Sequence, residues 1–472
     1  MGWWPLAVIA SAHLMAILDA TVMFVALPSL QHGLGMSSTS RQWVVTAYTV
    51  ALGGFLLPGG RLADRLGARR TLLIGVIGFA CASAVGGAAV DSAMIITARA
   101  VQGAFAAILI SSTKSLLVIV YADEDERARV MGVFSATLAS GGAIGLVLGG
   151  ALTSVLSWRW CLYLNVAFAL VALVGAPRVL PAIRGDNRVR IDLRSVLLAA
   201  LGMGALVYGL GEAASAGWGS AQIICSLAVA ALALTVFAVR QIGHADRLLP
   251  LRVVLDRNRG WAMIGLIVNG LSTYGMFLVL TYQLQSIMGY SALQTGLALI
   301  PFAGAASITA ALLTPLLMVR VPPRWLMTAA IAGEAAGLVP LIWLTPHSGY
   351  LPLVLIAGLI EGIATGVATP TTLNTALGGV LPADSGAAGA ATSAASQLGS
   401  SVGAALLNTI AVTAAASYLT LHPTASVVTG TVHGFTVAMV WGAAITLAAA
   451  VPIAIFVNAK TPSPRTKARE AP

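Results

Sequence analysis

Apolar runs of about 20 residues recur along almost the whole of this 472-residue chain, and a helix needs about this length to cross the hydrocarbon core of a bilayer. Backbone N–H and C=O groups in lipid must pair within the chain, so helices are expected rather than isolated strands. Only 9% of the residues are charged, whereas soluble domains have roughly 25%. We therefore expect an all-α membrane protein and exclude the soluble classes of enzyme and nucleic-acid-binding protein.

Polar breaks between the apolar runs divide the chain into fourteen predicted transmembrane helices. Segments of alternating polarity, which mark a membrane β-barrel, do not occur in the sequence. The predicted spans cover residues 5–30, 42–62, 71–90, 93–119, 128–155, 160–180, 195–214, 220–240, 260–282, 292–318, 325–345, 350–377, 386–413 and 433–458.

The basic residues are divided unevenly between the two sets of loops. Of 26 Lys and Arg residues, 22 lie in the even-numbered connections and the C-terminal tail, and only Arg41 and Arg159 lie in the opposite loops. Cytoplasmic loops carry an excess of Lys and Arg, so both termini are predicted to be cytoplasmic. The net charge of +10 is then explained by topology and anionic lipid, and nucleic-acid binding loses its support.

A loop motif joins the second and third predicted spans and reads GRLADRLGARR from Gly60 onwards. Gly60 and Gly67 allow a tight turn between two helices. Asp64 can accept hydrogen bonds from a helix N-terminus or an arginine, while Arg65 and Arg69 face lipid headgroups. The motif resembles the signature cytoplasmic loop of the major facilitator superfamily, G-x-L-A-D-R-x-G-R-R/K-R/K.

Further motifs narrow the resemblance to the fourteen-span drug:proton antiporters of that superfamily. Leu146 stands where their antiporter motif has proline, and leucine keeps this span regular. The matching segments are LDATVMFVALP at 18–28, RAVQG at 99–103, the glycine series Gly132, Gly141, Gly145, Gly149 and Gly150, WRW at 158–160 with NV at 165–166, and LQSIMGYS at 284–291.

The resemblance implies the major facilitator fold, with six plus six core helices in two pseudo-symmetric halves and two extra helices inserted between them. In transporters built from such repeats the substrate site lies between the halves near mid-bilayer. The implied division is an N-terminal half at 1–180, inserted helices and linkers at 181–259, a C-terminal half at 260–459 and a disordered cytoplasmic tail at 460–472.

The loop motif and the glycine face of the fifth span are predicted to take part in conformational gating. Gly141, Gly145 and Gly149 are spaced by four, so they lie on one helix face and let a neighbouring backbone approach closely. Close packing of this kind is also what any helix bundle needs, so the face by itself does not establish a gate.

Four charged residues inside the predicted spans are candidates for proton coupling. An ionised carboxylate at mid-bilayer costs roughly 3 kcal/mol or more, so such groups usually face a cavity or a partner. Asp19 lies about halfway along the first span, within the exporter motif, and is predicted to be the principal coupling carboxylate. The resemblance of RAVQG to the exporter motif implies a buried role for Arg99 in proton release, and snorkelling of its side chain to the membrane surface is the alternative. Glu334 and Glu361 are candidates by depth, with a buried hydrogen-bonded carboxyl as the alternative.

Six side chains are predicted to line the substrate cavity. Met15 and Met23 lie one turn either side of Asp19, and flexible thioethers suit varied apolar compounds. Plain packing, or bridging between helices, is the alternative interpretation for all six. The other four are Asn269, Tyr274, Tyr282 and Asn374.

These features predict a proton-coupled antiporter that exports small amphipathic or cationic compounds, such as antibiotics, across a bacterial cell membrane. The proton gradient replaces a cofactor, and the expected partners are the substrate, protons and lipid around a monomer. An importer or proton symporter of a small metabolite on the same fold is the first alternative. A membrane-embedded enzyme is the second, and its nearest catalytic cluster, the acidic run at 123–126, is better explained as a solvated loop.

The charge bias predicts an even number of crossings with both termini in the cytoplasm. Reporters that are active only in the cytoplasm or only outside the membrane, fused in turn to each terminus, should both report the cytoplasm. Opposite locations for the two termini would contradict the even number.

Overall fold

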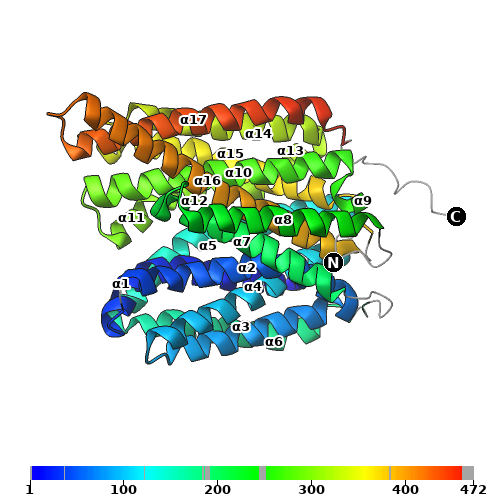
Figure 1. Cartoon of the computed structure of the whole chain (residues 1–472). Helices are drawn as coiled ribbons and strands as arrows, with labels where there is room; N and C mark the ends of the chain where they lie inside the picture. The colour runs from blue at the N-terminus through cyan, green and yellow to red at the C-terminus, as the bar shows by residue number, and fades with distance from the viewer. Residues whose placement is uncertain are drawn as a thin grey trace.

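The computed structural model describes residues 3–36, 38–121, 123–182, 185, 192–243, 251–381 and 384–459. In these residues every regular element is helical, and the long helices lie side by side in one bundle (Figure 1). The elements are α1 (Trp4–Gly33), α2 (Ser38–Leu66), α3 (Ala68–Gly87), α4 (Ser92–Val120), α5 (Glu124–Val155), α6 (Trp158–Val179), α7 (Leu193–Ala216), α8 (Ala221–Gly243), α9 (Leu251–Val254), α10 (Arg257–Tyr282), η1 (Gln283–Ile287), α11 (Ala292–Ala298), α12 (Ile300–Ile308), η2 (Thr309–Leu313), α13 (Thr314–Arg320), α14 (Pro323–Leu338), η3 (Val339–Trp343), η4 (Tyr350–Val354), α15 (Leu355–Leu377), α16 (Ser385–Leu421) and α17 (Val427–Phe456).

Fourteen helical segments of the described chain are long and apolar enough to cross a membrane, which confirms the predicted number. The largest difference concerns the last connection, which the sequence places at 414–432. Helix α16 continues to Leu421, and α17 begins at Val427. The side chain of Ser426 accepts a hydrogen bond from the Thr429 N–H at 3.1 Å and so caps α17 early.

Local capping sets several other helix ends. Asp91 accepts a hydrogen bond from the Met94 N–H at 2.8 Å at the start of α4. Ser291 and Gln294 form a reciprocal capping box at the start of α11. Gly67 separates α2 from α3 with a φ of 90°, a backbone conformation that favours glycine.

The packing of the first six spans, α1–α6, is repeated by the last six, α10–α17. In the N-terminal half α1 packs against α5 and α6, and α3 packs against α4 and α6. In the C-terminal half the corresponding helices pair α10 with α16 and α17, and α14 with α15 and α17. The two halves are therefore pseudo-symmetric, as the resemblance to the major facilitator superfamily implies.

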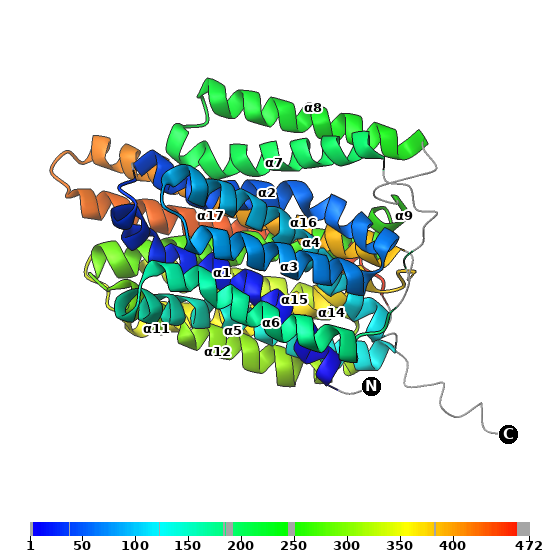
Figure 2. The same cartoon turned by 90° about the horizontal axis from the view of Figure 1, so that it is seen from below.

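Helices α7 and α8 form a pair at one edge of the bundle (Figure 2). Helix α7 packs against α2 of the N-terminal half and against α16 of the C-terminal half, while α8 packs against α7. Helix α1 begins and α17 ends at the same end of the bundle (Figure 1), here called the terminal end. The predicted disordered tail at 460–472 lies outside the described residues.

The glycine face of α5 packs inside the N-terminal half, against α1. A Cβ atom on Gly145 would collide with Thr21 Oγ1, and one on Gly149 would lie 3.0 Å from the Val22 backbone. Helix α5 is continuous past Leu146, as the sequence predicts. The expected gating role of this face stays a prediction, and the contact observed is with the helix that carries Asp19.

Replacement of Gly145 with valine is expected to destabilise the protein by about 1–3 kcal/mol, the usual cost of overpacking. Thermal unfolding of the purified protein in detergent measures the loss. Gly142→Val is the matched control because no heavy atom lies within 4 Å of a Cβ placed there. Equal losses in the two variants would contradict this account of the contact between α1 and α5.

Candidate functional site

A buried ion pair joins α1 to α4 in the N-terminal half. Arg99 Nη1 lies 2.5 Å from Asp19 Oδ2, and each residue is only 2% exposed. Arg99 Nε also donates to the Val44 carbonyl at 3.2 Å, and its guanidinium lies 4.2 Å from the centre of the Tyr48 ring. The arginine is thus held by α2 as well as by the carboxylate it neutralises.

The second carboxylate oxygen of Asp19 is bound by two side-chain amides. Gln102 Nε2 donates to Asp19 Oδ1 at 2.8 Å, and Asn165 Nδ2 of α6 donates to it at 2.7 Å. Both amides also donate to Ser83 Oγ of α3, at 2.7 and 3.3 Å. The RAVQG motif, the NV motif and the exporter motif of the first span therefore meet at one carboxylate.

Arg99, Gln102 and Asn165 direct N–H donors at the two oxygens of Asp19, and a carboxylate can accept at both. Breaking a buried, hydrogen-bonded ion pair by removing one partner typically costs about 3–5 kcal/mol. The sequence predicts Asp19 and Arg99 as site residues. Gln102 and Asn165 lie within recognised motifs, but no role is predicted for either of them from the sequence. Ser83 carries no signal in the sequence that would have singled it out.

Met15 and Met23, predicted to flank Asp19 in a substrate cavity, are buried in hydrophobic packing of the N-terminal half. They are 0% and 2% exposed. Neither methionine is open to a cavity in this conformation. Their predicted contact with substrate would require a different conformation of the protein.

The C-terminal half brings Glu334 of α14 and Glu361 of α15 to facing helix surfaces. Both residues are fully buried, at 0% exposure. Asn269 Nδ2 of α10 donates to Glu334 Oε1, and Ser272 Oγ of α10 donates to Glu361 Oε1 at 2.9 Å. The two glutamates, which the sequence treats as separate candidates, thus share a neighbouring helix.

The four predicted cavity residues of the C-terminal half lie at separate places. Tyr274 and Tyr282 of α10 are 53% and 50% exposed. Asn269 contacts Glu334, and Asn374 lies at the terminal end, where its Oδ1 accepts a hydrogen bond from Arg127 Nε at 3.3 Å. The structure does not bring the four together at one site.

The loop motif lies at the terminal end and contacts the opposite half. Asp64 Oδ1 accepts a hydrogen bond from the Gly386 N–H at 2.8 Å, in the first turn of α16. A Cβ on Gly60 would collide with Ala390 and the Gly386 carbonyl. Nearby, Ser115 Oγ of α4 and Ser385 Oγ are 2.8 Å apart, so α2 and α4 both close against α16.

The two glycines of the loop motif therefore have different roles. Only Gly67 forms the turn, whereas Gly60 lies within α2 and lets α16 approach, which corrects the expectation that both allow the turn. Arg65 is exposed, as expected for a residue that faces headgroups. Arg69 Nη1 instead donates to the Leu180 carbonyl at 3.0 Å and ties α3 to the end of α6.

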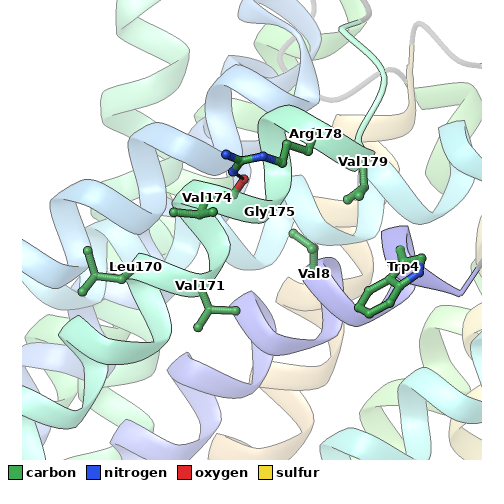
Figure 3. A pocket seen from close by; sticks show the side chains of 8 residues that line it. All are labelled: Trp4, Val8, Leu170, Val171, Val174, Gly175, Arg178 and Val179. Atoms are coloured by element: carbon green, nitrogen blue, oxygen red, sulfur yellow. Dashed lines mark hydrogen bonds between the residues drawn. The ribbon is translucent and has the colours of Figure 1, made fainter.

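An apolar groove of about 580 Å³ lies between α1 and α6, on the outer surface of the N-terminal half (Figure 3). Trp4, Val8 and Val171 line it, and Arg178 lies towards the terminal end. Arg178 Nη1 donates to the Val174 carbonyl at 2.6 Å. Both helices belong to one half, so this groove is not the predicted site between the halves.

The contact of Asp64 with the start of α16 predicts that its charge stabilises the closed terminal end. Asp64→Asn keeps the shape but removes a negative charge from a helix N-terminus, which is worth about 0.3–1 kcal/mol. Oxidative cross-linking between Ser115→Cys and Ser385→Cys should therefore fall in the Asp64→Asn protein.

The cross-linking is done after replacement of the three native cysteines, Cys81, Cys161 and Cys225. Asp123→Asn is the control because Asp123 caps α5 by accepting from the Glu126 N–H at 2.9 Å, and asparagine caps equally well. An unchanged cross-linked fraction in Asp64→Asn would show that the charge does not hold this end closed.

Comparison with known proteins identifies the family of this chain. Residues 9–404 match the model of the Major Facilitator Superfamily. The chain is 42% identical over 464 residues to the puromycin resistance protein pur8 of Streptomyces alboniger, covering 97% of this chain and 92% of that protein. It is 38% identical over 360 residues to the cephamycin export protein CmcT of Amycolatopsis lactamdurans, covering 75% and 74%.

Among solved structures, that of the human organic anion transporter MFSD10 superposes with a TM-score of 0.66 at 16% identity and covers 95% of this chain and 99% of that one. At this identity the likeness concerns the fold. The match of the superfamily model to most of the chain and the extended identity to pur8 establish the family. The chain belongs to the major facilitator superfamily and is a membrane transporter rather than an enzyme.

Proposed function

We propose that this protein exports small amphipathic or cationic compounds of the antibiotic class across a bacterial cell membrane in exchange for protons. The names of two relatives support export, because one confers puromycin resistance and the other exports cephamycin. The identity to the puromycin resistance protein extends over 97% of the chain. The terminal end is the cytoplasmic end in this proposal, in agreement with the 22 basic residues on that side.

The observation that carries proton coupling is the fully buried Asp19–Arg99 pair. Arg99, Gln102 and Asn165 together surround the carboxylate of Asp19 with N–H donors. A proton can bind Asp19 only when these donors move away, because a protonated carboxyl would leave the arginine charge unpaired. Proton uptake at Asp19 is therefore linked to a change in the packing of α1 against α4.

The helices that carry the pair also reach the contacts between the halves. Helix α4, which holds Arg99, packs against α16 at the terminal end, where a Cβ on Gly389 would lie 3.0 Å from the Ser111 carbonyl. A shift of α4 that frees Asp19 thus also loosens the closed end. Net exchange follows if substrate and proton favour different conformations, since each ligand shifts the equilibrium only by its differential affinity.

This mechanism predicts that Asp19→Asn still inserts into the membrane, is destabilised by about 3–5 kcal/mol because Arg99 loses its partner, and loses active export. Asparagine keeps the size and the hydrogen-bonding oxygen, and it removes the group that titrates. Asp19→Glu should keep some activity with a shifted pH optimum, because the carboxylate is displaced and not deleted. Substrate-dependent proton flux in inverted membrane vesicles, screened over a panel that includes puromycin, measures both effects.

Asp91→Asn is the matched control for this experiment. It makes the same chemical change at an exposed helix cap, where asparagine replaces aspartate well. Normal proton-coupled export by the Asp19→Asn protein, at the same expression level, would show that Asp19 is not a coupling carboxylate.

A further inference from the structure

Glu334 and Glu361 form a carboxyl pair at the contact between α14 and α15. A Cβ atom on Gly337, one turn after Glu334, would lie 2.6 Å from Glu361 Oε2. Thr365, one turn after Glu361, donates from Oγ1 to Glu334 Oε1 at 3.5 Å. Each glutamate side chain therefore reaches the helical turn next to the other.

Each carboxyl has one satisfied oxygen and one oxygen without a partner. The Oε1 atoms accept from Asn269 and Ser272, whereas neither Oε2 atom has a hydrogen-bond partner in the described structure. Both side chains are fully buried. An unpaired acceptor in such a place costs free energy unless something binds it, and a proton is the smallest group that does so.

The described surroundings supply no positive charge to the pair. In the described structure, neither glutamate forms a hydrogen bond or an ion pair with an arginine, histidine or tyrosine of the helices packed around it. Most of those groups lie towards helix ends, and Tyr274 lies within α10. They are Arg127 and Arg129 of α5, Arg257, Arg259, Tyr274 and Tyr282 of α10, Arg320 of α13, Arg324 of α14, Tyr350 of η4, Tyr418 of α16 and His433 of α17. On α5 the acidic Glu126 also lies at the helix start.

The contrast with Asp19 is chemical. Asp19 receives a guanidinium and two amides, while Glu334 and Glu361 receive only amide and hydroxyl donors and lie beside a second carboxyl. Two ionised carboxylates buried close together without a cation cannot both persist, and such a pair shares a proton instead.

We propose that Glu334 and Glu361 form a single proton-binding site of the C-terminal half, occupied in this conformation and titrating as one unit. The proton comes from water and binds one of the two free Oε2 atoms. The protein then carries a proton in one half while Asp19 in the other half is ionised, so the two halves bind protons in different conformations. This deepens the proposed function and rests on it only for the transport measurement below.

Infrared difference spectroscopy of the purified protein tests the site without substrate. The wild type should show the C=O band of a protonated carboxyl at neutral pH, and Glu334→Gln and Glu361→Gln should each lower the pH at which that band is lost. The remaining carboxyl then has no charged neighbour, so it ionises more readily. Absence of a protonated band in the wild type, or loss of only half the band with the rest unchanged in each variant, would overturn the proposal.

Ser272→Ala provides a second variant that keeps both carboxyls. It removes the hydroxyl that donates to Glu361, so the protonated band should move in frequency and remain present. Because the two carboxyls share the proton, loss of a donor to one of them alters the pair as a whole, and an unchanged band would contradict a shared site. The comparison of this variant with the wild type tests the proposal even if the glutamine variants fail to fold.

Vesicle transport then tests whether the pair acts as one unit in coupling. Each single glutamine variant should lose substrate-dependent proton flux, and the double variant should lose no more than either single one, because contacting residues are not additive. Asp91→Asn should behave as wild type. Additive partial losses would contradict a shared site. If the wild type itself shows no substrate-dependent flux, the proposed function fails, and the infrared result still decides whether the pair holds a proton.

Discussion

A charge buried in a lipid-embedded bundle must be compensated by the protein itself, and this constraint organises both candidate sites. In the N-terminal half it is met by an ion pair, because Arg99 and the amides of Gln102 and Asn165 surround Asp19. In the C-terminal half no basic partner contacts Glu334 or Glu361 in the described chain, and two oxygen atoms stay unsatisfied. The pseudo-symmetric halves thus meet the same constraint differently, by an ion pair in the N-terminal half and, in our proposal, by a bound proton in the C-terminal half.

Helix α16 shows how one small-residue helix serves both halves. Near its start, Gly386 packs against Gly60 and Asp64 of the N-terminal half. Further along, Gly399 and Gly403 pack against α10 of the C-terminal half. The small residues of α16 therefore extend from the contact between the halves to the interior of the C-terminal half, so one helix packs closely against both α2 and α10.

The positions and number of the spans could be predicted from the sequence because lipid permits only internally bonded helices, and apolar runs report them directly. Asp19 and Arg99 could be predicted because an intramembrane charge is rare. The convergence of Gln102, Asn165 and Ser83 could not, since it depends on the relative rotation of four helices. The pairing of Glu334 with Glu361 likewise depends on how α14 meets α15, and no local pattern encodes that contact.

Helix α7 changes how much of the boundary between the two halves faces lipid. It covers the boundary at which α2 meets α16, and Glu212 Oε1 accepts a hydrogen bond from Thr46 Oγ1 of α2 at 2.8 Å there. The Trp218 indole N–H, just beyond α7, donates to Thr409 of α16. On the other side α5 meets α12 and α15 directly. Helix α7 thus screens the α2–α16 boundary from lipid, whereas the α5 boundary has no such cover among the packed helices described, so the inserted pair makes a pseudo-symmetric transporter asymmetric towards its lipid surroundings.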